Sequence, residues 1–129
     1  MTPQPGSSLT FINHASFLIT TERINLLIDP WVEGTSFNTG WSLLDDSTSN
    51  QHVYSALDND RNVIIWYSHE HSDHFSVSFL KSYPERLKTK TVVLFQHTFD
   101  KRVINFLKGA GFDAREQISG SRFLFDRDG

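Results

Sequence analysis

The 129-residue chain contains no cysteine, which excludes a disulfide framework, a thiolate zinc finger and a cysteine nucleophile. No apolar run approaches the ~18 residues of a membrane-spanning helix, and the first six residues lack the basic start of a signal peptide. Basic residues are also few: 12 Lys and Arg stand against 15 Asp and Glu, so no nucleic-acid partner is expected. The sequence therefore predicts one domain of a soluble, cytoplasmic protein without an integral membrane segment.

Two residue types are abundant instead: 11 phenylalanines, which predict a core, and six histidines. Short apolar segments bounded by turn residues predict strands at 9–13, 16–20, 24–28, 63–67, 91–95, 114–118 and 122–125. Helices are expected from Ser76 or Ser78 to Tyr83, before Pro84, and along 99–110, where apolar residues recur at helical spacing. The first three strands predict an antiparallel meander, and the later segments a βαβ-like unit. The predicted fold class is α+β, with a mixed sheet.

Residues 31–62 are rich in Gly, Ser, Thr, Asn and Asp and show no sustained period. Because most connections in compact domains are about 4–6 residues long, this segment either hides a short helix near 52–57 or forms a functional loop. Trp31, Phe37 and Trp41 can pin such a loop against the body of the domain. The alternative is that these aromatic residues are only packing anchors.

A polar segment rich in histidine follows the continuous apolar run Val63–Tyr67. In an extended or looped segment residues i and i+2 point the same way, so His69 and His71 can share one metal ion. Asp73 and His74 follow where the chain turns, and they can bind a second ion nearby. Imidazole and carboxylate ligands without thiolate suit Zn2+, and also Mn2+ or Fe. The alternative is a solvated polar loop whose histidines have no role.

These residues carry a resemblance to a known family. His69-x-His71-x-Asp73-His74 matches the HxHxDH signature of the metallo-β-lactamase fold superfamily, in the expected place after a buried strand. Upstream, the chain also resembles one branch of this superfamily, which includes ascorbate-phosphate lactonases and N-acyl-phosphatidylethanolamine phospholipases. The similar segments are Asn13-His14-Ala15-Ser16 and Leu27-Ile28-Asp29-Pro30-Trp31. The sialic-acid hydroxylase-like members are similar at Trp31, Phe37, Trp41 and Ser68-His69-Glu70-His71.

The resemblance covers residues 9–126 and implies the N-terminal half of a four-layered αββα fold, with helices on one face of the mixed sheet. The whole chain, residues 1–129, is then expected to be a truncated domain. The pair Asp128–Gly129 agrees with this, because it is a hairpin-turn signal without a returning strand. An uncovered apolar sheet face and an exposed edge at Phe123–Phe125 are expected to favour self-association.

The roles of the family's ligands carry over to the matching positions. His69 and His71 would belong to the first metal site, and Asp73 and His74 to the second. Asp73 would also be the catalytic carboxylate that orients metal-bound hydroxide. The family completes its two sites with another histidine, a bridging aspartate and a final histidine, most of which would lie after the last residue of this chain.

Four further residues surround this prediction. Asp29 matches an acid that steadies the metal loop of the family by hydrogen bonds. His14 matches a position near the mouth of the site, with a role toward the substrate or the ligands, or it is a surface turn residue. His97 is either a third ligand of the first ion or, as its place between a strand and a helix favours, a cap or surface residue. Nothing in the sequence around His52 supports a site.

Two functions follow from these residues. The first is a metal-dependent hydrolase, in which metal-bound hydroxide attacks the phosphoester, lactone or amide of a small-molecule or phospholipid-like substrate. The second is a non-catalytic fragment of such a domain. Four ligands divided between two ions leave two for each, whereas a catalytic zinc usually has three protein ligands. On that count the chain alone is expected to bind metal weakly and to be inactive.

Overall fold

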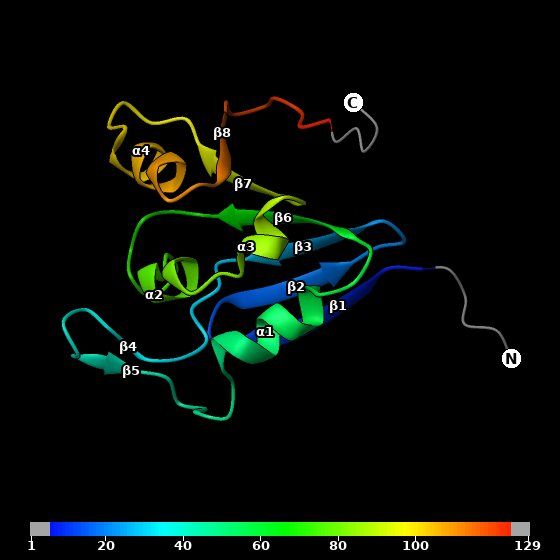
Figure 1. Ribbon diagram of the computed structural model, residues 1–129. Coiled ribbons are helices and arrows are strands. Elements are labelled where there is room, and N and C mark those ends of the chain that lie inside the picture. The colour runs from blue at the N-terminus through cyan, green and yellow to red at the C-terminus, as the bar shows by residue number, and fades with distance from the viewer. Residues whose placement is uncertain (1–5, 125–129) are drawn as a thin grey trace, which may run out of the picture.

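The computed structural model describes residues 6–124, which fold around one six-stranded mixed sheet (Figure 1). In order across the sheet, its strands are β1 (Ser8–Asn13), β2 (Ser16–Thr20), β3 (Ile24–Ile28), β6 (Asn62–Tyr67), β7 (Thr91–Gln96) and β8 (Asp113–Gln117). The first three strands pair antiparallel, and β3, β6, β7 and β8 pair parallel. Both the predicted meander and the predicted βαβ-like unit are therefore confirmed.

The four helices found within residues 6–124 lie on the same face of this sheet (Figure 1). They are α1 (Asn50–Leu57), α2 (Val77–Lys81), α3 (Glu85–Lys88) and α4 (Arg102–Gly109). Alternate residues of the central strands, such as Ile65 and Val93, are fully buried against helical side chains that include Leu57, Phe79 and Leu107. One sheet and one helical layer correspond to half of the four layers that the sequence predicts.

The opposite face of the sheet is apolar but much less covered. Ile64, Val92 and Leu94 form a second, smaller cluster, against which Trp66 and Phe123 pack. Phe11, which the strand register connects through β2 and β3 to Trp66, is 60% exposed. The expected open apolar face is present in the part of the chain that the structure describes.

Several predicted boundaries were wrong. Phe99 belongs to the predicted apolar helix face but precedes α4 and is fully exposed, because the helix begins only after the Asp100 carboxylate accepts the Arg102 amide hydrogen (2.9 Å). Pro84 ends the predicted helix and also precedes the unpredicted α3, as suits a residue with a fixed φ and no N–H. Residues 122–124 form no strand, since Phe123 packs on the sheet face instead. The predicted turn at Asp128–Gly129 lies outside the described residues.

The segment before α1 combines one confirmed prediction with a missed element. The short helix expected near 52–57 is α1, which Ser49 caps by accepting the His52 amide hydrogen (3.1 Å). Before it, β4 (Thr35–Ser36) and β5 (Trp41–Ser42) form a two-stranded ribbon too short to show a sequence period. None of the helices within residues 6–124 has the length and apolar character needed to cross a membrane.

Candidate metal centre

The histidine-rich loop begins directly after β6, at the carboxyl end of a central parallel strand. Its residues 68–75 form bends and turns, and no regular helix. The His71 carbonyl accepts hydrogen bonds from the amides of His74 (2.9 Å) and Phe75 (2.8 Å), which close the turn. The loop therefore has the position and the conformation that the sequence predicts.

The candidate ligand atoms gather in two groups that share one carboxylate. The first group is His69, His71 and Asp73, and the second is His14, Asp73 and His74. Within each group the ligand atoms lie within 4.8 Å of one another. The structure thus brings together the four predicted ligands and adds His14, which the sequence analysis placed near the mouth of the site.

Asp73 lies between the two groups and is buried. Its Oδ2 atom is 3.1 Å from His14 Nε2 and 3.4 Å from His74 Nε2. Burial acts to raise the pKa of the Asp73 carboxyl, but the hydrogen bond from His14 and the charge of His74 together lower that pKa below its usual value. The ionised carboxylate is the form that binds a metal ion.

Asp29 fastens the loop to the end of β3. Its backbone has a positive φ of 45°, and its carboxylate is buried. Oδ1 accepts the amide hydrogen of Ser68 (2.7 Å), and Oδ2 accepts hydrogen bonds from the Ser68 hydroxyl (2.7 Å) and from Nδ1 of His74 (2.9 Å). One carboxylate therefore holds both the start of the loop and one candidate ligand.

The same contacts decide which ring nitrogens of His69 and His74 are available to a metal ion. A carboxylate only accepts, so His74 carries its proton on Nδ1. The Ser68 hydroxyl gives its hydrogen to Asp29, so its oxygen accepts from Nδ1 of His69 at 2.8 Å. In the neutral forms of both histidines, Nε2 keeps its lone pair for a metal ion. Sequence reasoning missed Ser68, whose only signal is a hydroxyl directly before the first histidine.

Three residues considered in the sequence lie outside both groups. His97 is exposed at the end of β7, with Nδ1 3.5 Å from Oε2 of Glu116, in agreement with a surface role. His52 is exposed on α1. Glu70, between the two ligand histidines in sequence, lines a separate cavity and belongs to neither group.

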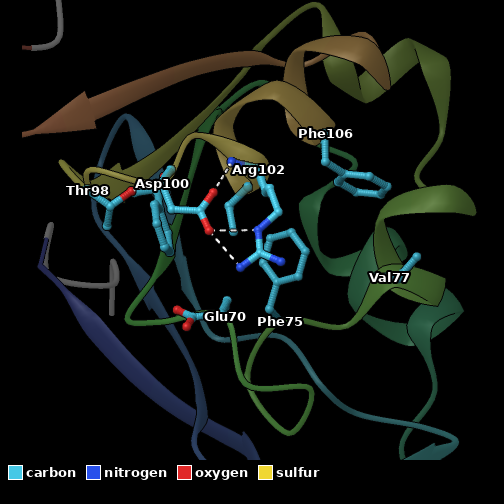
Figure 2. A pocket seen from close by; sticks show the side chains of 9 residues that line it. Glu70, Phe75, Val77, Thr98, Asp100, Arg102 and Phe106 are labelled. Atoms are coloured by element: carbon cyan, nitrogen blue, oxygen red, sulfur yellow. Dashed lines mark hydrogen bonds and ion pairs between the residues drawn. The ribbon is translucent and has the colours of Figure 1, made fainter.

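Two cavities adjoin the loop. One of about 440 Å³ contains His14 in its wall, together with Trp31, Trp41 and Leu43. The other, of about 380 Å³, is shown in Figure 2, where Glu70 lies opposite an ion pair between Asp100 and Arg102 (Nε to Oδ2, 2.7 Å). Only the first cavity shares a residue with the two ligand groups.

A mixed sheet whose central strand ends in a cluster of histidines and an aspartate defines a class of α+β domain with a candidate metal site. Residues 8–129 match the Beta-lactamase superfamily domain, and the chain belongs to this family. The resemblance seen in the HxHxDH motif and the predicted fold are thus confirmed.

Its relatives are much longer proteins. The chain is similar to the cytidine monophosphate-N-acetylneuraminic acid hydroxylase of Danio rerio, with 32% identity over 75 residues, 57% of this chain and 12% of the relative. It is also 31% identical over 75 residues to a protein of Mycobacterium tuberculosis named as a Rieske 2Fe-2S iron-sulfur protein, covering 58% and 14% of the two chains. A solved structure of a CmlA β-hydroxylase variant has the same fold over 91% of this chain and 22% of its own, with a TM-score of 0.54 and 18% identity.

Proposed function

We propose that the chain carries the metal-binding part of a metal-dependent hydrolase, in which His69, His71, Asp73 and His74 bind two ions. The supporting observation is the meeting of two ligand groups at Asp73. Neutral imidazole and carboxylate fit Zn2+, with Mn2+ or Fe as alternatives. We assign Asp73 as the catalytic carboxylate because it is the residue common to both groups.

The protein's own groups prepare the site for hydrolysis. Bound divalent cations lower the pKa of a water molecule and polarise the oxygen of the group under attack. Asp73 orients that water by accepting its hydrogen bond. Asp29 and Ser68 keep the Nε2 atoms of His74 and His69 free and aimed at the cluster.

The cavity beside His14 is the proposed substrate site. Trp31, Trp41 and Leu43 make its wall largely apolar, and His14 connects it to the ligand groups. An apolar or aromatic part of a small-molecule or phospholipid-like substrate would lie against the two tryptophans. Its phosphoester, lactone or amide would then face Asp73.

The name of the Danio rerio relative favours a second candidate, a hydroxylase. Fe, one of the metals that suit imidazole and carboxylate ligands, would then occupy the same ligand groups. The chain spans only 12% of the length of the Danio rerio hydroxylase. Hydroxylase activity is therefore a proposal for this chain, and it rests on the same ligand residues.

The third candidate is a non-catalytic metal-binding fragment. Its basis was a count of two protein ligands for each ion. Asp73 belongs to both groups and the second also includes His14, so each group contains three candidate ligands, and turnover by the chain alone would overturn the fragment alternative.

The test uses the chain loaded separately with Zn2+, Mn2+ and Fe2+. The hydrolase proposal predicts hydrolysis of a phosphodiester, lactone or amide that a chelator abolishes and that Asp73→Asn lowers, with His52→Asn as the matched control. Bound Zn2+ without hydrolysis would favour the fragment. Iron retained through purification, with oxygen consumed in the presence of a reductant, would favour the hydroxylase.

We also propose that two copies associate through the open sheet face. Leu9 and Phe11 are 66% and 60% exposed there, and large exposed apolar patches promote association. Phe11→Ser is expected to lower the dimer fraction in sedimentation experiments. An unchanged monomer in both proteins would contradict this proposal.

A further inference from the structure

The cavity shown in Figure 2 lies between the loops that follow two neighbouring parallel strands. Glu70 and Phe75 belong to the loop after β6, and Thr98, Asp100 and Arg102 to the loop after β7 and the start of α4. Open parallel sheets commonly bind ligands outside the carboxyl ends of their strands. The volume of about 380 Å³ is within the range of small-molecule sites, about 300–1,000 Å³. None of the residues that line this cavity belongs to the two ligand groups, so it is a separate candidate site.

Three phenylalanines supply much of the cavity wall. They are Phe75, Phe95 and Phe106. Phe75 and Phe95 are buried members of the main core, and Phe106 packs against that core from α4, so the wall is formed before any ligand binds. The rings of Phe75 and Phe106 meet edge-on, with centroids 6.0 Å apart and planes at 69°. The face of an aromatic ring attracts a cation within about 6 Å of its centroid. This wall therefore suits an apolar group or an organic cation.

The charged side chains at the rim distinguish between these two kinds of ligand. Asp100 and Arg102 neutralise each other: Oδ1 accepts the Arg102 amide hydrogen (2.9 Å), and Oδ2 accepts from Nε (2.7 Å). Glu70 lies opposite this pair and makes no hydrogen bond or ion pair within residues 6–124, although its charge acts on Arg102 from a distance. Two carboxylates and one guanidinium leave the cavity with one net negative charge.

We propose that this cavity binds an organic cation, a protonated or quaternary amine joined to a small apolar body. The body fills the space between the three phenylalanine rings, and the ammonium group lies at the rim beside Glu70. An anionic ligand would meet the uncompensated Glu70 and an arginine whose charge is already paired, so charge complementarity disfavours it. This site requires neither a bound metal ion nor hydrolysis.

Three ligands with a common phenylethyl group test the preference for charge: 2-phenylethylammonium, 2-phenylethanol and 3-phenylpropionate. Binding is followed in 1H–15N NMR titrations of the labelled chain with a chelator present, so that the result is independent of the metal centre. We expect the ammonium ligand to bind about tenfold more tightly than the alcohol, and the carboxylate to bind most weakly. The amides of Glu70, Thr98 and Val103 should shift. Equal affinity for the ammonium ligand and the alcohol, tighter binding of the carboxylate, or no shift at these amides would overturn the proposal.

Two substitutions separate the contributions of the charge and the rings. Glu70→Gln keeps the size of the side chain and should weaken binding of the ammonium ligand about two- to fivefold, without a change for the alcohol. Phe106→Leu keeps an apolar side chain but removes one ring, and it should weaken binding of the ammonium ligand more than that of the alcohol. Glu22→Gln is the matched control, because Glu22 is exposed before β3, at the opposite end of the sheet. Circular dichroism verifies each fold. If both cavity variants bind the ammonium ligand as the parent does, the proposal is wrong.

Discussion

The two ligand groups differ in how the chain assembles them. His69, His71 and Asp73 come from one loop, whose turn is closed by its own backbone hydrogen bonds. The group of His14, Asp73 and His74 joins residues 59 positions apart, and its geometry depends on the pairing of β1, β2, β3 and β6. A motif can therefore show the first group completely while leaving out one member of the second.

The two groups nevertheless share their support. Asp29 contacts His74 directly and reaches His69 through the Ser68 hydroxyl. Variants of these residues can therefore separate effects common to both groups from effects on one.

Asp73→Asn should have the largest effect, because it changes the one residue that both groups contain. The side-chain volume stays the same, but the charge that holds the ions and orients the water is lost. We expect hydrolysis to fall about 10³-fold or more and the zinc content to decrease. Steady-state kinetics and metal analysis measure these effects. Unchanged zinc content and rate would show that Asp73 is not a ligand.

Asp29→Asn should weaken both groups by a smaller amount. Asparagine tolerates the positive φ of this position, so the backbone can be retained. Without the charged acceptor, His69 and His74 lose the preference for a proton on Nδ1, and Zn2+ affinity should fall about 10–100-fold at both sites. Competition with a chromophoric chelator measures both affinities. An effect at only one site would contradict the shared support.

Ser68→Ala should affect the first group alone. It removes the hydroxyl between Asp29 and His69 and leaves the contact of Asp29 with His74 in place. We expect a loss of about tenfold in Zn2+ affinity at the first site. This is the lower end of the range for residues that hydrogen-bond to a metal ligand without binding the metal. In NMR spectra His69 should become a mixture of tautomers and His74 should not. Equal changes in both rings would mean that the alanine disturbs the whole loop.

His97→Ala should have the smallest effect, since His97 is exposed and lies outside both groups. Affinity and rate should agree with the parent within about twofold, as for other surface substitutions. Chelator competition is again the measurement. A marked loss at the first site would restore the alternative in which His97 completes that site.

The sequence by itself determined the parts of the molecule that are local. Alternation and apolar runs predicted the strands of the central sheet, and the spacing of His69, His71, Asp73 and His74 predicted a metal loop after β6. These features are readable because strand period, turn chemistry and ligand spacing depend on neighbours within a few residues.

Tertiary structure alone decided which equivalent residues meet. Trp31 is 2% exposed, whereas Trp41 from the same segment is 53% exposed and packs edge-on against Phe37. His14 reaches Asp73, while His52 and His97 remain outside the cluster. Within each comparison the residues are of the same type. The outcome depends on sheet register and on contacts between segments tens of residues apart, which no local pattern encodes.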